Sequence, residues 1–81
     1  AEATDADKFA AVRAAVLEVL PHGAPGMTPN ELNRAVRSKV PQDLFPGGEK
    51  SGWWVKAVQL DLEARDVIAR APKAPVRLWQ V

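Results

Sequence analysis

The most informative stretch of the sequence is residues 47–70, GGEKSGWWVKAVQLDLEARDVIAR. After its glycines, apolar residues recur at helical spacing, which predicts a helix over residues 49–65. Val67 and Ile68 then begin a β-branched stretch, which predicts a strand over residues 67–70. The segment therefore encodes a long helix that leads directly into a β-strand.

This helix is apolar on two sides when its residues are placed at 100° intervals. One apolar arc holds Val55, Val58 and Leu62, and the other holds Trp53, Ala57, Leu60 and Ala64. Two apolar faces are typical of a central helix that packs on other helices and on a hairpin. We therefore expect Trp53 and Trp54 to be buried. An exposed tryptophan would instead favour a partner or dimer interface, where tryptophan is enriched.

The remaining arc is polar, and we interpret it as a solvated helix face with some capacity to address DNA. It comprises Glu49, Gly52, Lys56, Gln59 and Glu63. Gln and Lys can contact base edges in a major groove, whereas carboxylates would face the phosphate field.

The glycine-rich start of the helix is not a phosphate loop of the Walker type. That motif requires G-x-x-x-x-G-K-[ST], with Lys directly after the last glycine. Here Lys50 and Ser51 follow Glu49, whose carboxylate would repel an anion. We interpret the glycines as a sharp entry to the helix, with Ser51 or Gly48 as its N-cap.

Two further helices are predicted upstream by their capping patterns. Thr4 and Asp7 begin a helix over residues 5–20, which Pro21-His22-Gly23 ends. Its apolar stripe is formed by Phe9, Val12, Val16, Val19 and Leu20.

The second helix is predicted over residues 29–40. Thr28 as N-cap, Pro29 at the first helical position and Glu31 form a complete capping box. Met27, just before it, is expected to make a single short β contact. In the connection that follows, Leu44 and Phe45 are expected to be buried.

The C-terminal residues predict a β-hairpin. Residues 71–75, APKAP, form a turn because two prolines cannot sit within a ladder, and residues 76–81, VRLWQV, alternate as a strand does. We expect residues 76–81 to pair with residues 67–70. The predicted fold class is α+β, mainly α: three helices and a C-terminal two-stranded hairpin in a single domain over residues 1–81.

This order of elements resembles a winged helix-turn-helix domain, with the hairpin as the wing. In winged-helix regulators the third helix commonly ends in Leu-Glu-x-x-Gly-apolar-Ile-x-Arg. The matching residues here are Leu62, Glu63, Val67, Ile68 and Arg70. Asp66 replaces the usual glycine, and Asp tolerates the left-handed conformation. The longer stretch over residues 43–65, DLFPGGEKSGWWVKAVQLDLEAR, is also similar to a small group of bacterial proteins of unknown function, a resemblance that implies the fold and no activity.

The composition excludes several classes of protein. The 81 residues include no cysteine, so neither disulfides nor thiolate metal sites are available, and a reducing cytoplasm fits best. The apolar runs are too short for a membrane span, and residues 1–8 lack the order of a signal peptide. His22 is the only histidine and lies in a Pro/Gly turn, so we expect no catalytic site, no metal, no cofactor and no enzymatic activity.

Basic charge is concentrated in the second part of the chain. Residues 32–81 hold nine basic and five acidic residues, although the net charge of the chain is only +1. We therefore predict a surface for double-stranded DNA, which the wing and the third helix would contact mainly at phosphates. The predicted contact residues are Arg34, Arg37, Lys50, Ser51, Lys56, Gln59, Arg70, Lys73 and Arg77.

A second hypothesis is a winged-helix module that binds a protein partner, or a second copy of itself, without nucleic acid. Its surface would be a face that carries Trp and Leu side chains. The sequence alone leaves both hypotheses open.

Overall fold

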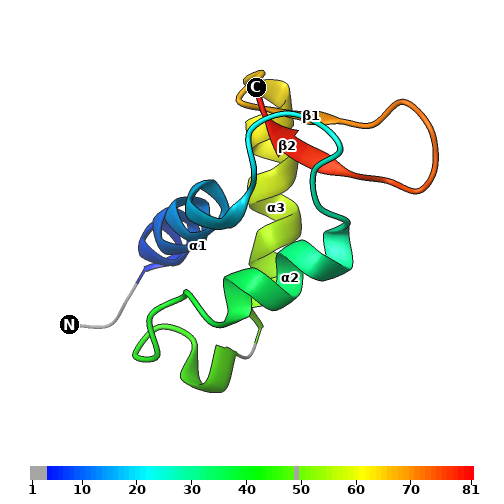
Figure 1. The fold of residues 1–81 in the computed structure, drawn as a ribbon. Helices are drawn as coiled ribbons and strands as arrows, with labels where there is room; N and C mark the ends of the chain where they lie inside the picture. The colour runs from blue at the N-terminus through cyan, green and yellow to red at the C-terminus, as the bar shows by residue number, and fades with distance from the viewer. Residues whose placement is uncertain (1–3, 49) are drawn as a thin grey trace.

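The computed structural model describes residues 4–48 and 50–81. Three α-helices are followed by an antiparallel β-hairpin, which confirms the expected mainly helical α+β class (Figure 1). The elements are α1 (Asp5–Val19), α2 (Pro29–Arg37), the short 3-10 helix η1 (Pro46–Gly48), α3 (Ser51–Ala64), β1 (Ile68–Arg70) and β2 (Leu78–Gln80).

Both predicted capping boxes are present. The Asp7 backbone N–H donates to Thr4 Oγ1 at 3.1 Å, and the Thr4 N–H donates to the Asp7 carboxylate at 2.9 Å. At α2 the Glu31 N–H donates to Thr28 Oγ1 at 3.2 Å, and the Thr28 N–H donates to Glu31 Oε1 at 2.9 Å. Each box satisfies two backbone donors that a helix start would otherwise leave without partners.

Helix α2 ends at Arg37, three residues before the predicted end. The Ser38 hydroxyl donates to the Ala35 carbonyl at 2.9 Å, and a turn follows in which the Val40 N–H donates to the Val36 carbonyl at 3.0 Å. Pro41 has no N–H to donate to the carbonyl four residues earlier, that of Arg37, so the helical hydrogen-bond pattern cannot continue beyond this turn.

The hairpin is joined to the connector between α1 and α2. Strand β2 pairs with β1 on one side, with Ala69 opposite Trp79. On its other side Leu78 exchanges two hydrogen bonds with Met27, each 2.8 Å, which confirms the predicted β contact. A second isolated bridge joins His22 to Gln80. The C-terminal strand therefore lies between β1 and the connector.

The hydrophobic core forms where α3 packs against α1, α2 and β1. The first predicted arc of α3, Val55, Val58 and Leu62, is buried within it. Phe45 is also buried, as predicted, and Leu44 packs half-buried against the core. The buried apolar residues are Val12, Ala15, Val16, Leu20, Leu32, Val36, Val40, Phe45, Val55, Val58, Leu62, Ile68 and Leu78.

The second apolar arc of α3 is not covered by the hairpin. Trp53 is 71% exposed and Leu60 is 53% exposed, so the predicted burial of Trp53 is wrong. Trp54 is half-buried and packs against the core. The reason is that the hairpin continues from the C-terminal end of α3 and pairs with the α1–α2 connector, rather than lying along the helix (Figure 1).

The polar arc of α3 lies beside α2 and the hairpin, and its interpretation as a solvated face is wrong for two of its residues, whereas Gly52 and Lys56 are exposed. Gln59 is only 8% exposed, and Glu63 is half-buried. At Gly52 a β-carbon would lie 3.9 Å from the Asn33 side chain, an ordinary van der Waals contact between α3 and α2. Glu49 lies outside the described residues.

Candidate nucleic-acid interface

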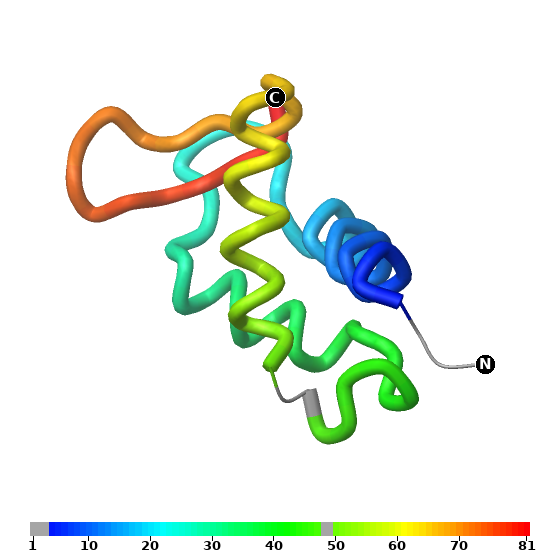
Figure 2. Tube along the Cα trace, turned by 180° about the vertical axis from the view of Figure 1, so that it is seen from behind, coloured from blue at the N-terminus to red at the C-terminus, as the bar shows by residue number. Residues whose placement is uncertain are grey.

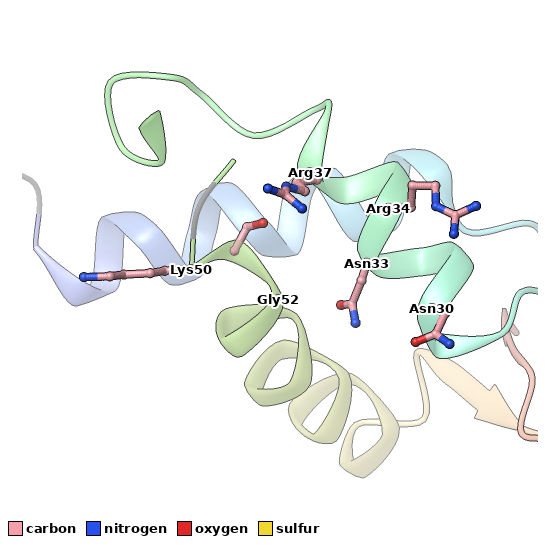
Figure 3. A pocket seen from close by; sticks show the side chains of 7 residues that line it. Asn30, Asn33, Arg34, Arg37, Lys50 and Gly52 are labelled. Carbon is pink, nitrogen blue, oxygen red and sulfur yellow. The ribbon is translucent and has the colours of Figure 1, made fainter. Parts of the chain in front are cut away.

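A pocket of about 490 Å³ lies between α2 and the start of α3 (Figure 3). Helix α2 contributes four polar side chains at positions i, i+3, i+4 and i+7, which fall on one face of a helix. The residues that line the pocket are Asn30, Asn33, Arg34, Arg37, Lys50, Ser51 and Gly52.

A second pocket, of about 320 Å³, continues this surface toward the hairpin. It shares Asn33 and Gly52 with the first pocket, so the two form one continuous depression, which we call the α2/α3 groove. The residues that line the second pocket are Pro29, Asn33, Gly52, Val55, Lys56, Gln59, Arg70 and Val76.

The groove brings together seven of the nine predicted contact residues. These are Arg34, Arg37, Lys50, Ser51, Lys56, Gln59 and Arg70. Lys73 lies in the exposed loop between β1 and β2, which projects from the body of the molecule (Figure 1), and Arg77 lies beside α2 near Glu31. Neither of these two residues lines the groove.

The groove carries an excess of positive charge, although one of its cations, Arg70, is paired with Glu63. Five of its side chains are exposed cations, and the described residues that line it include no acid. Figure 3 shows Arg37 beside the gap between α2 and α3, whereas Arg34 and Lys50 extend away from each other. Cations spread along a groove match a row of phosphates better than one small anion.

Two of the cations near the wing are held by carboxylates. Arg70 Nε and Nη2 donate to the Glu63 carboxylate oxygens at 3.0 and 3.2 Å. Arg77 Nη1 lies 3.8 Å from Glu31 Oε1 and donates to the Gly26 carbonyl at 3.3 Å. The positive potential of the hairpin base is therefore partly neutralised within the protein.

The Glu31 carboxyl is kept ionised by its place in the capping box. The backbone N–H of Thr28 is the main cause that lowers its pKa, followed by the Thr28 side chain and then by Arg77 and Arg34. Glu31 thus carries a negative charge beside the groove without lining it.

Helix α3 begins with an unusual backbone at the edge of the groove. Lys50 is the N-cap residue and adopts a left-handed conformation, with φ of 65°, and its side chain makes no capping bond. The prediction that Ser51 or Gly48 would be the N-cap is therefore wrong. Ser51 is instead the first residue of the helix and is buried.

Asn30 and Asn33 are groove residues that the sequence-based set of contacts missed. Asn33 Oδ1 is buried and has no hydrogen-bond partner among the described residues. Their spacing of three residues, on the same helical face as Arg34 and Arg37, is the sequence signal that could have identified them.

Within the described part of the chain, no helix has the length and apolar character that crossing a membrane requires. The same residues contain no cluster of three or more His, Cys, Asp or Glu side chains that could hold a metal ion.

Comparison with curated proteins and with solved structures finds no match. A family model described as a family of unknown function, DUF6958, matches residues 1–78. The match extends over α1, α2 and α3 and includes the first residue of β2. Since it spans nearly all of the sequence, the chain belongs to the family of unknown function DUF6958.

Proposed function

We propose that this chain is a winged-helix nucleic-acid-binding protein that holds double-stranded DNA along the α2/α3 groove. The observation that carries the proposal is a set of four exposed cations, Arg34, Arg37, Lys50 and Lys56, that line the groove together with Arg70, which is paired with Glu63; the described lining residues include no acid. The order of three helices and a C-terminal hairpin, which resembles the winged helix, supports it.

In this proposal Arg34, Arg37 and Lys50 contact phosphates at one end of the groove, and Lys56 contacts them further along. Such contacts position the duplex and supply affinity without reading its sequence. Asn30 and Asn33 share this face of α2 with the two arginines, and their amides can donate to phosphate or sugar oxygens. Affinity should therefore fall steeply as salt is added.

The hairpin would act as the wing. Lys73 is exposed in the loop that projects from the body and could contact a phosphate beyond the groove (Figure 1). The lack of cysteine is consistent with work in the cytoplasm, where nucleic acid is present.

Fluorescence anisotropy with a short labelled duplex tests the proposal. We expect binding at about 50 mM salt that weakens strongly by about 200 mM salt. Arg37→Glu and Arg34→Glu should each weaken binding at least about tenfold at low salt, because each replaces a phosphate contact with a repulsive charge.

Arg13→Glu is the matched control. Arg13 is exposed on α1 and does not line the groove, and its reversal changes the net charge by the same amount. We expect a much smaller loss with this variant. An equal loss with Arg13→Glu, or no binding of the wild type at low salt, would overturn the proposal.

A protein-interaction module is the second candidate function, and one specific observation favours it. Trp53 and Leu60 are largely exposed on α3, and neither lines the α2/α3 groove. Mutation of Trp53 or Leu60 therefore tests this second candidate without changing a residue that lines the groove.

A further inference from the structure

The outward face of α3 carries an apolar stripe formed by Trp53, Ala57, Leu60 and Ala64. Trp53 is 71% and Leu60 53% exposed, Ala64 is exposed, and Ala57 is half-buried. The stripe lies opposite the arc that α3 buries in the core. Figure 2 shows the molecule from behind, where no other helix lies in front of α3.

The stripe alternates large and small side chains in an order that complements itself. We propose that it binds the same stripe of a second copy of this chain, with the two α3 helices antiparallel about a two-fold axis between positions 58 and 59. Residues at equal distances on either side of this axis then face each other, which pairs residue numbers that add up to 117. Trp53 faces Ala64 of the second copy, and Leu60 faces Ala57. Each large side chain meets a small one, as close packing requires.

A parallel pair does not have this fit. It would place Trp53 against Trp53 and Ala57 against Ala57, so bulky side chains would collide at one level and leave a gap at the next. The antiparallel pair is also isologous, since each copy presents the same surface, and it closes as a dimer.

The charged residues beside the stripe favour the same pairing. Lys56 and Glu63 lie on one flank of the stripe. The two-fold axis places this flank of one copy beside the same flank of the second copy. Lys56 then lies within two residues, about 3 Å along the axis, of the level of Glu63 in the second copy. Glu63 already accepts hydrogen bonds from Arg70 of its own chain at 3.0 and 3.2 Å, so the attraction of Lys56 in the second copy adds to that pair.

The other flank holds a second complementary pair. Trp54 is half-buried and Arg65 is exposed, and their positions have the same sum, 119, as Lys56 and Glu63. The Arg65 guanidinium of one copy, which is paired with Asp61 at 3.0 Å, thus lies near the level of the Trp54 ring of the other copy, where a cation–π contact can add to that ion pair. Both flanks are therefore satisfied by the register that matches large with small side chains.

The interface is a single helix face, so the dimer is expected to be weak. Stable specific interfaces bury about 1,200–2,000 Å² in total, and one seam of four residues on each side falls below that range. The inference does not depend on nucleic-acid binding.

Sedimentation velocity across micromolar to millimolar protein tests the inference. The wild type should shift from monomer toward dimer as concentration rises. Leu60→Lys should remain monomeric, because it places a charge at the centre of the seam. Val81→Lys is the control, since Val81 is 79% exposed and lies outside the stripe. It should behave as the wild type does.

A mixing experiment tests the antiparallel register. Lys56→Glu alone and Glu63→Lys alone should each self-associate less, because like charges would then face each other. An equimolar mixture of the two variants should form a heterodimer, since both charge pairs are restored in it. Circular dichroism checks that each variant is folded, and if Glu63→Lys is not, Lys56→Glu and Leu60→Lys still test the seam.

Three results would overturn the inference. A wild type that sediments as a monomer at every concentration would show that the stripe does not bind a second copy of this chain. An equal effect of Val81→Lys and Leu60→Lys on self-association would show that the stripe does not form the interface. A mixture of folded charge variants that stays monomeric would exclude the antiparallel register.

Discussion

Arg70 in β1 is held by both carboxylate oxygens of Glu63 in α3, at 3.0 and 3.2 Å. Glu63 also accepts a hydrogen bond at 3.3 Å from Gln59, which lines the groove. The two hydrogen bonds between Arg70 and Glu63 join α3 to β1, the first strand of the hairpin. This pairing also neutralises the cation at one end of the α2/α3 groove, so Glu63 limits how strongly that end can attract a polyanion.

Replacement Glu63→Gln should strengthen the binding of duplex DNA at low salt. Glutamine has nearly the same shape but no charge, so Arg70 becomes available for a phosphate contact. The slope of log affinity against log salt should become steeper by up to about 0.9, the value for one added contact. Anisotropy titrations at several salt concentrations measure this slope.

The control for this prediction is Asp61→Asn. Arg65 lies 3.0 Å from Asp61 in an ion pair within α3, outside the groove, so this variant makes the same change in charge and releases an arginine elsewhere. An equal gain in affinity in both variants would show that the gain comes from the change in net charge and not from a contact in the groove.

Replacement Gly26→Ala should destabilise the fold far more than Gly23→Ala. Both glycines have positive φ, 77° and 83°. A β-carbon at Gly26 would collide with the carbonyl of Leu78, whereas one at Gly23 meets nothing within 4 Å. Gly23→Ala should cost about 1–2 kcal/mol of unfolding free energy from its backbone conformation, and Gly26→Ala about 1–3 kcal/mol more from the collision.

Urea unfolding of both variants measures this difference, and Gly23→Ala is the internal control for backbone strain. The pairing of Met27 with Leu78 should be lost together with the stability, because the collision lies at that bridge. Similar unfolding free energies in the two variants would contradict the close approach of the connector to β2.

At acidic pH the protein should lose the part of its unfolding free energy that the ionised Glu31 carboxylate contributes. Its pKa is lowered in the folded protein from an ordinary 4.5, mainly by the Thr28 backbone N–H. The ionised carboxylate therefore stabilises the fold above pH 4.5, and this contribution disappears as pH falls through the lowered folded pKa. Glu31→Gln keeps an oxygen for the capping box but loses the charge.

The wild type should therefore be more stable than Glu31→Gln at neutral pH, and the difference should shrink below pH 4.5. Thermal unfolding of the two proteins over this range measures the difference. Other carboxyls, including Asp7 in its own capping box, are present in both proteins, so their contributions cancel in the difference in stability. A difference that stays constant with pH would refute the assignment of this effect to the Glu31 charge.

The local structure of this chain could be predicted from sequence because its signals are short in range. A Thr with an acidic residue three positions later closes its capping box with neighbouring backbone groups, as at Thr4 and Thr28. The left-handed conformation of Asp66, with φ of 59°, was likewise foreseen from its place after the helix. The three helices and the hairpin follow from such signals.

The site was predictable in part. Arg34 and Arg37 belong to a polar helix face that the sequence already separates from the apolar stripe of α2, and Asn30 and Asn33 share that face. Residues on one helix face stay together in any fold. Their meeting with Lys50 and Lys56 depends on how α2 packs against α3, which the pattern of either helix alone does not specify.

The sequence by itself established which residues form the helices and strands, and that α3 has two apolar sides, because periodicity is a property of one segment. Only the packing of segments selected the side that is buried. Strand β2 pairs with Met27 of the connector, so the hairpin leaves Trp53 exposed, whereas Gln59, in the groove beside α2 and the hairpin, is only 8% exposed. Helical periodicity cannot carry this information, because the partners of each face are distant in the chain and are brought together only by the fold.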